Sequence, residues 1–489
     1  MTGLGTFLDR SKAIAHAAAL ACGLATCAPQ GSPTIGAARP ALTPAPSRGS
    51  AGQSLTMPAP PDAGAPTTGG PGAEADLVAR TLRRVESIRG LAAIRPVPGV
   101  VLSREELIDR VKAHVIRELP PEAIRNEGRA LQLFGFIPID FDYEAATYRL
   151  LRSQLAGYYE PSDGTMYMAA DLGTDDAKAT LAHELVHALQ DQHWDLEARS
   201  RYRAGQGDLA ETVSALAEGD ATSAMLDVMI ARALPGRSVS AANLPEDVFA
   251  DQMRQAMAAS PGADAPHVMR TSLVAPYLYG TLFVNALRRR GGWAAVDRAW
   301  TDAPSTSEQI LHVEKWDAHE PALTVPPPPF ATLGQGWHVA DEDSEGELGT
   351  RITFEEWMPA DAAARASAGW GGDRGVLLTH DDLMAFAWRL QYDATAKRDE
   401  LAARSYDVIT HALTESIGAP SVTAARFACR ERPDRGPFAI ARDGEDLLVV
   451  LGPARVGTTE WTSAGSCELS RRWVAEIAAP RRSGDGERH

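Results

Sequence analysis

The sequence predicts an α+β protein with two folded units: a mainly helical domain that contains a small β-hairpin, and a smaller α+β domain after it. Three observations favour this fold class. Segments with helical periodicity dominate the first unit, one hairpin pattern interrupts them, and strand patterns flank a helix after a run of four prolines. The chain has 489 residues, which is enough for two or three hydrophobic cores.

Charge and hydropathy exclude two classes of protein. Lys and Arg total 48 against 64 Asp and Glu, so the net charge is −16, which opposes binding to a phosphate backbone. We therefore expect no nucleic-acid partner. No segment approaches the ~20 consecutive strongly apolar residues that a membrane-spanning helix needs, which excludes a polytopic membrane protein.

The first element, residues 1–27, has the layout of a bacterial export signal. Two basic residues precede a run of small and apolar residues, and Leu24–Cys27 resembles the lipobox at which lipoprotein signals are cleaved. Cys27 would then carry the lipid. Cys22 is a second candidate, with a shorter apolar segment before it. We expect an exported lipoprotein of the cell envelope, on the periplasmic or extracellular face, that touches the membrane only through its N-terminal anchor.

Two segments are predicted to be disordered. Residues 28–75 consist mainly of Pro, Gly, Ala, Ser and Thr, and cannot bury enough apolar surface to offset the entropy of ordering, so they are interpreted as a tether. Residues 481–489 are polar and charged and are interpreted as a disordered tail.

The first folded unit is predicted over residues 76–329. Ser103 and Glu106 form a capping box that opens a helix, and the pattern Asp208-x-x-Glu211 predicts a second box. A turn at Pro161–Gly164 between aromatic segments predicts a hairpin over 156–168. Helices are predicted over 104–119, 122–133, 143–155, 174–192, 208–234, 245–259 and 276–290, and a short one through Trp300.

The second unit, residues 330–480, begins after Pro326–Pro329 and is predicted to be an accessory α+β domain. Strands are predicted over 375–380, 384–392, 438–443 and 447–451, and a helix over 396–413. Cys429 and Cys467 are the two cysteines of the mature chain, and a disulfide between them would stabilise the fold by roughly 3–4 kcal/mol. Two separately buried thiols are the alternative.

The most informative motif is His183-Glu184-Leu185-Val186-His187, inside a predicted helix. Residues four apart on a helix lie on one face, so the two imidazoles can bind one Zn²⁺ ion. Glu184 lies beside them, where its carboxylate can accept a proton from a water molecule that the metal has made acidic. The motif predicts a metal site with Glu184 as the catalytic base.

Two residues compete to be the third ligand, which a catalytic zinc site needs in addition to an open position. His193 has the spacing of the third histidine in HExxHxxGxxH, but Gln190 occupies the position of the glycine that lets the chain turn there. Glu218 lies on the next predicted helix among alanines, where a buried carboxylate needs a compensating cation. Glu218 is the preferred ligand, with Asp220 as a structural acid and Glu211 as a helix cap.

Four segments resemble an uncharacterised bacterial family of exported zincin-type metallopeptidases: Leu181–Leu196, Leu216–Thr222, Pro276–Gly280 and Pro304–Trp316. The resemblance covers roughly Arg80–Pro327, and Gly346–Arg374 is also similar. It implies a zincin fold of the gluzincin type, the ligands His183, His187 and Glu218, and Glu184 as the base. It implies no particular substrate. Thr222 stands where thermolysin-like gluzincins have an acid that supports the metal site.

A peptidase also needs a group that stabilises the oxyanion of the tetrahedral intermediate. Tyr279 and His312 are the candidates, together with Tyr277 from the same segment. The hairpin over Tyr158–Met168 could supply an edge strand that holds an extended peptide by main-chain hydrogen bonds.

These observations predict a zinc-dependent peptidase that acts on peptides or proteins through a metal-activated water and a glutamate base. The alternative is a zinc-containing, non-catalytic binding or structural lipoprotein of the cell envelope. Glu184 favours the enzyme, because a structural zinc site needs no base beside it.

Overall fold

The computed structural model describes residues 71–120, 122–171, 174–233, 236–240, 248, 255, 265–393 and 398–479. The predicted signal with Cys22 and Cys27, the tether up to residue 70, almost all of the helix predicted over 245–259 and the tail lie outside these residues. Within them the chain is α+β, with a C-terminal sheet, as predicted. No helix in these ranges has both the length and the apolar composition that a bilayer crossing requires.

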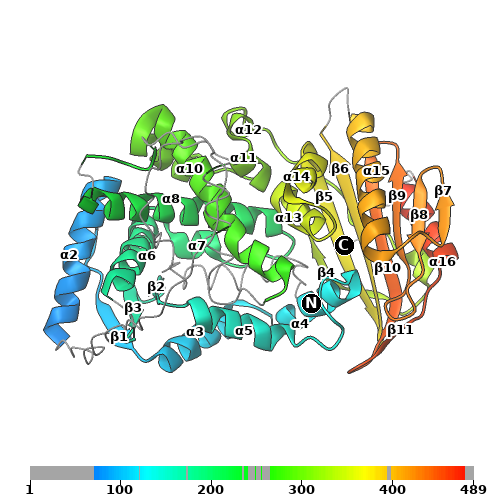
Figure 1. Ribbon diagram of the computed structural model, residues 1–489, viewed down its shortest axis with the longest axis horizontal. Coiled ribbons are helices and arrows are strands. Elements are labelled where there is room, and N and C mark those ends of the chain that lie inside the picture. The colour runs from blue at the N-terminus through cyan, green and yellow to red at the C-terminus, as the bar shows by residue number, and fades with distance from the viewer. Residues whose placement is uncertain are drawn as a thin grey trace, which may run out of the picture.

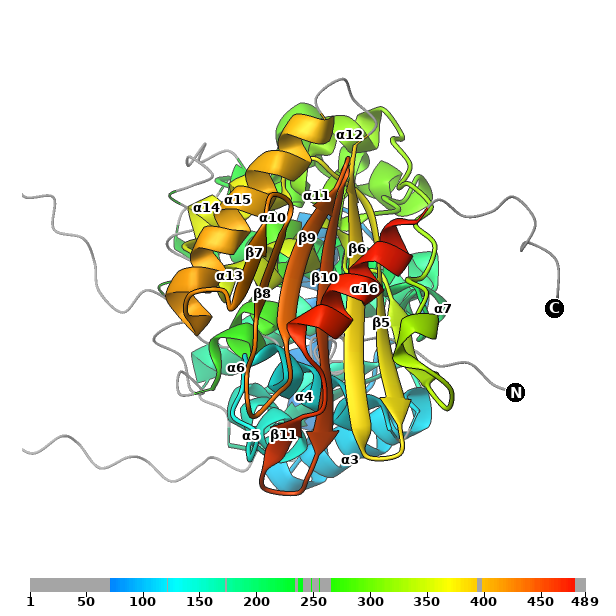
Figure 2. The same ribbon diagram turned by 90° about the vertical axis from the view of Figure 1, so that its right-hand side faces the viewer.

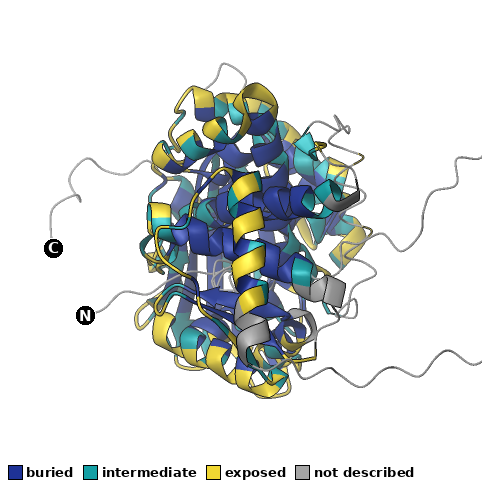
Figure 3. Cartoon of the chain, turned by 90° about the vertical axis from the view of Figure 1, so that its left-hand side faces the viewer, coloured by how far each residue is buried: buried dark blue, intermediate teal, exposed yellow. Residues whose placement is uncertain are grey.

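The N-terminal part is a layered array of helices (Figure 1). Helix α2 begins at Pro71, so the tether predicted to residue 75 ends earlier than expected. Its face formed by Val78, Leu82 and Val85 is buried, while its outer face is exposed (Figure 3). The helices are α2 (Pro71–Arg89), α3 (Arg104–Glu118), α4 (Ala123–Phe134), α5 (Tyr143–Gln154), α6 (Thr174–Trp194), α7 (Leu196–Ser200), α8 (Gly207–Ala233), α10 (His267–Thr301), α11 (Ser307–Leu311) and α12 (Val313–Asp317).

A small sheet lies against these helices. Its strands are β1 (Gly99–Leu102), β2 (Gly157–Glu160) and β3 (Thr165–Ala169), in the order β1-β3-β2. Strands β2 and β3 form the predicted antiparallel hairpin, and β1 adds to β3 in parallel. Strand β2 is therefore an edge strand, and it packs on α6.

The C-terminal part is one antiparallel eight-stranded sheet with helices on both faces (Figure 2). Residues alternate between the two faces, so Leu377 faces the inner helices and Leu378 faces α16. Its elements are η2 (Ala331–Leu333), β4 (His338–Asp343), α13 (Gly346–Glu355), α14 (Ala360–Ser367), β5 (Trp370–His380), β6 (Leu383–Tyr392), α15 (Arg398–Ile417), β7 (Val422–Ala424), β8 (Phe427–Arg430), β9 (Phe438–Asp443), β10 (Asp446–Val456), β11 (Trp461–Ser463) and α16 (Cys467–Ala478).

The two parts share one continuous hydrophobic core rather than a polar interface, because a single buried cluster runs from α3 to the inner face of the large sheet. Buried Arg432 also connects them, since its guanidinium donates to the carbonyls of Leu133 and Phe134 at the C-terminus of α4. A disulfide joins Cys429 of β8 to Cys467 at the start of α16, the pair expected from the sequence.

Two helix starts differ from the sequence predictions. Helix α8 begins at Gly207, whose N–H donates to Asp343 of β4, while Asp208 accepts from the N–H of Ser307. The predicted capping box is therefore wrong: Asp343 caps the start of α8, the Asp208 carboxylate instead accepts from the start of α11, and Glu211 lies buried inside the helix. Helix α10 begins at His267, with Pro276 inside it, and continues to Thr301 across non-helical residues at Gly291 and Gly292.

Candidate metal centre

The site is built on α6, a buried helix in which Leu181, Leu185 and Ala188 pack into the core. His183 and His187 project from one face of this helix, with ring centroids 4.8 Å apart. Their Nε2 atoms lie 3.1 Å from each other. Two ring nitrogens at this separation are directed at a common point, as the spacing of the motif predicts.

Glu218 of α8 completes a cluster of three donors. Its Oε2 lies 3.0 Å from His183 Nε2, and its Oε1 lies 3.6 Å from His187 Nε2. One donor atom from each residue falls within 4.8 Å of the other two. All three side chains are buried, with exposed fractions of at most 1%. The preferred third residue of the sequence analysis therefore lies with the two histidines.

The electrostatics of this cluster favour a cation. Burial alone would raise the pKa of Glu218, but the adjacent imidazoles lower it to about 2. Burial would lower the pKa of His187, but the Glu218 carboxylate raises it to about 9. Without an ion, Glu218 therefore stays negatively charged at neutral pH, and His187 beside it holds a second proton. A divalent cation would replace that proton.

Close helix packing places Glu218. The next residue, Gly219, has no side chain, and a Cβ there would lie 2.1 Å from the carbonyl carbon of Gly280 in α10. The same approach brings Tyr277 of α10 to the site, where its ring stacks on His183 with 5.9 Å between ring centroids. The glycine in Ala-Glu-Gly-Asp is a packing residue that the sequence analysis missed. An isolated glycine in a helix is its signal.

Gln190 orients His187. Its Nε2 donates to the carbonyl of Ala217 at 3.0 Å, which leaves its Oε1 to accept from His187 Nδ1 at 2.8 Å. Because Nδ1 then carries a proton, the other nitrogen, Nε2, is free to face the cluster. Gln190 thus connects α6 to α8 through the carbonyl of Ala217, the residue that precedes Glu218. The sequence analysis weighed Gln190 only as a missing glycine, although its position three after His187 puts both on one helical face.

Glu184 lies on the side of α6 that faces the small sheet. Its Oε2 accepts from the backbone N–H of Tyr159 in β2 at 3.1 Å. A second contact joins the same strand and helix, since the Tyr159 hydroxyl donates to Asp191 at 2.9 Å. The edge strand and the glutamate are therefore fixed to each other, and the charge of Glu184 acts on His187 of the donor cluster.

Three residues named in the sequence analysis lie elsewhere. His193 makes a 2.8 Å hydrogen bond to the carbonyl of Ala92 and is not part of the cluster. Tyr279 lies under the guanidinium of Arg351, and His312 pairs with Glu347 at 2.9 Å. Tyr279 and His312 line one pocket of about 360 Å³. Residues two apart on a helix point in nearly opposite directions. Tyr277 therefore contacts His183, whereas Tyr279 points away from His183.

Two other acidic groups have structural roles. Buried Asp220 accepts from Arg89 at 2.6 Å and from the indole of Trp300 at 2.9 Å. A second set of clustered acids, Glu308, Glu320 and Asp393, surrounds the ammonium group of Lys315 at distances of 2.6 to 3.0 Å. The Lys315 ammonium thus occupies the point between these acids where a cation would sit, which leaves His183, His187 and Glu218 as the metal-binding candidate among the described residues.

Comparison with known proteins identifies one region of the chain. Residues 335–461, which span most of the large sheet, match a family model described as a domain of unknown function, DUF8575. No curated protein and no solved structure matches the chain. The match leaves the metal centre outside it, and its description assigns no activity to the C-terminal part.

Proposed function

We propose that the protein is a zinc-dependent peptidase of the zincin type, which hydrolyses peptide bonds in peptide or protein substrates. The observation that carries the proposal is the convergence of two imidazole nitrogens and the Glu218 carboxylate from two helices, with Glu184 next to His183 in α6 and its charge acting on His187. Two imidazoles and one carboxylate are a donor set that zinc prefers, and three protein ligands leave a fourth position for water or substrate.

Each residue of the site has a task in this proposal. His183, His187 and Glu218 would hold the ion, which when bound supplies a Lewis acid that lowers the pKa of a water molecule to near 7. Glu184 would accept a proton from the attacking water and deliver it to the leaving amine. Gln190 keeps the tautomer of His187 that presents Nε2.

Strand β2 is the proposed support for the substrate. It is an edge strand, and the Tyr159 amide already points at Glu184, so its outer side faces the catalytic helix. An extended peptide would pair with such an edge by main-chain hydrogen bonds. Tyr277 replaces Tyr279 and His312 as the aromatic residue of the site, because its ring contacts His183.

We further propose that the protein is exported and anchored through Cys27. The Cys429–Cys467 disulfide supports an oxidising compartment, since such bonds are rare in reducing cytosol. The alternative function, a zinc-stabilised lipoprotein without activity, draws support from the burial of the four site residues, each at most 1% exposed. Glu184 favours the enzyme, because a buried carboxylate beside a structural ion adds only a desolvation cost.

The test is hydrolysis of an unfolded protein such as casein by the purified chain, with and without a chelator. We expect chelation to abolish activity, added zinc to restore it, and Glu184→Gln to lower it at least ~100-fold with zinc content unchanged. Glu197→Gln, an exposed substitution on α7, is the matched control. A Glu184→Gln protein that keeps both zinc and full activity would contradict the mechanism, and zinc-loaded protein without any activity would favour the alternative.

A further inference from the structure

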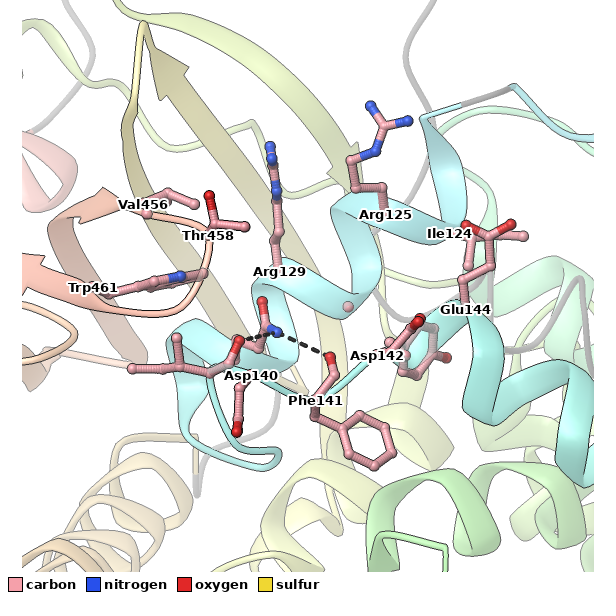
Figure 4. Close-up of a pocket in the computed structure, with 15 residues that line it drawn as sticks. Ile124, Arg125, Arg129, Asp140, Phe141, Asp142, Glu144, Val456, Thr458 and Trp461 are labelled. Carbon is pink, nitrogen blue, oxygen red and sulfur yellow. Dashed lines mark hydrogen bonds between the residues drawn. The ribbon is translucent and has the colours of Figure 1, made fainter.

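A second pocket lies between the helical part and the large sheet, and it shares no residue with the metal centre. It encloses about 490 Å³, within the range of small-molecule sites. Helix α4 contributes Arg125 and Arg129 to its lining, and the β10–β11 hairpin contributes Val456, Thr458 and Trp461 on the opposite side (Figure 4).

The two arginines lie one helical turn apart and extend in the same direction (Figure 4). Arg125 is exposed and Arg129 is half-buried. Within the ranges that the structure describes, neither guanidinium has a hydrogen bond or an ion pair. Burial and the charge of Arg125 both lower the pKa of Arg129. The pair therefore places two positive charges side by side on α4, without a direct hydrogen-bonded partner among the described residues, in a pocket whose lining also holds three carboxylates.

Other arginines close to this pocket are paired. Arg432 donates to two carbonyls at the end of α4, and Arg435 donates to the carbonyl of Gln132. Arg125 and Arg129 thus differ from these neighbouring arginines, whose guanidinium groups donate to backbone carbonyls. A partly buried guanidinium without a partner has a desolvation cost, and an anionic ligand would offset it.

Three acidic residues, Asp140, Asp142 and Glu144, also line this pocket, and within the described residues none of them forms an ion pair with Arg125 or Arg129. Asp142 caps α5 by accepting from the N–H of Ala145, and Asp140 points away from the arginines (Figure 4). These carboxylates would repel a ligand that is anionic along its whole length. The charge pattern favours a ligand with one localised anionic group.

We propose that this pocket binds a small organic molecule through a single oxyanion group, a carboxylate or a phosphate, held by Arg125 and Arg129. Guanidinium groups match the geometry of such oxyanions and form two parallel hydrogen bonds with them. The neutral part of the ligand would lie against Val456 and the ring of Trp461. Because the hairpin and α4 belong to different parts of the chain, such a ligand would contact both parts at once.

The test is isothermal titration of the full chain with three probes at constant ionic strength: inorganic phosphate, benzoate and benzamide. We expect an anionic probe to bind and benzamide, the neutral analogue of benzoate, not to bind. Binding of benzoate alone would identify a carboxylate ligand, and binding of phosphate alone would identify a phosphate ligand. Both outcomes support the site, and the readout is independent of hydrolysis.

Substitutions locate the binding. Arg125→Gln and Arg129→Gln should each weaken binding by about tenfold or more, because each removes a charge-assisted hydrogen bond. Arg149→Gln, an exposed substitution on α5 outside the pocket lining, should leave it unchanged. Neither glutamine variant should lower the melting temperature, since neither arginine has a partner to lose. The proposal is overturned if neither anion binds, if benzamide binds as well as benzoate, or if the double variant binds like wild type.

Discussion

Gly219 of α8 and Gly280 of α10 bring the backbones of their helices into direct contact, one residue from Glu218. A Cβ at Gly280 would lie 1.8 Å from the carbonyl oxygen of Ala215, a distance at which the helices must separate. The position of the third donor therefore depends on two residues without side chains. Side-chain chemistry alone does not reveal this dependence.

The first prediction concerns Gly280→Ala. Helix propensity alone would make this change stabilising by about 1 kcal/mol, whereas the contact with Ala215 predicts destabilisation by about 2–4 kcal/mol. The two effects have opposite signs, so chemical denaturation decides between them. Gly444→Ala, at a turn with no atom within 4 Å, is the control and should cost only about 1 kcal/mol for its positive φ. A stabilised Gly280→Ala protein would show that the helices do not meet as described.

The second prediction concerns the orientation of His187. Gln190→Ala removes the acceptor at Nδ1 and should weaken zinc binding by about 10- to 100-fold, measured by competition with a chromophoric chelator. Gln190→Glu keeps an acceptor for Nδ1 but loses the donor to Ala217, so it should have a smaller effect. Gln192→Ala, near the end of the same helix, is the matched control. Equal zinc affinity in Gln190→Ala and Gln192→Ala would rule out the orienting role.

Local signals predicted the elements whose determinants are local. The Ser103 capping box has both of its hydrogen bonds, and the turn at Pro161–Gly164 produces the hairpin. The box predicted at Asp208 failed because the α8 N-terminus is capped by Asp343, which is distant in sequence. Strand β4 and helices α13 and α14 were missed, since their burial depends on the shared core between the two parts.

In the metal centre, too, the features with local determinants were predicted and those that depend on long-range packing were missed. The four-residue spacing of His183 and His187 fixes their geometry within one helix, and the sequence was sufficient to predict it. Glu218 could be preferred because a lone carboxylate among alanines needs a cation. The contact of Tyr277 with His183 depends on the crossing of α8 and α10, and no local pattern distinguished Tyr277 from Tyr279.

The third prediction concerns the disulfide. Cys429 and Cys467 are separated by 38 residues, and the chain-entropy model gives a loss of about 3–4 kcal/mol when the bond is removed. Denaturation of the Cys429→Ser/Cys467→Ser protein should show this loss. Reductant should destabilise the wild type to a similar extent and leave the variant unchanged. If reductant lowered the stability of the variant as much as that of the wild type, the Cys429–Cys467 disulfide would not be its target.

The fourth prediction concerns pH. Burial raises the pKa of Glu308 to about 8, although its carboxylate accepts from Lys315. The folded protein therefore holds a proton there that the unfolded chain releases at its ordinary pKa of about 4.3. The stability from this group is complete below that value and is lost as the pH rises through 8.

Denaturation at several pH values between 5 and 9 tests this direction. The free energy of unfolding of Glu308→Gln should depend less on pH than that of the wild type. Between pH 5 and pH 9 its stability relative to the wild type should rise by on the order of 1 kcal/mol or more. Glu197→Gln, which is exposed, should follow the wild-type curve. A Glu308→Gln curve parallel to that of the wild type would show that Glu308 is not protonated in the folded state.

The most direct test of the metal centre is the zinc content of the purified chain and of two variants, measured by elemental analysis together with the folded fraction. From the proposed function we predict one zinc ion per wild-type chain, its loss in Glu218→Ala, and its retention in His193→Ala, because His193 makes a hydrogen bond with the carbonyl of Ala92 instead. Loss of zinc from folded His193→Ala with retention in Glu218→Ala would contradict the account.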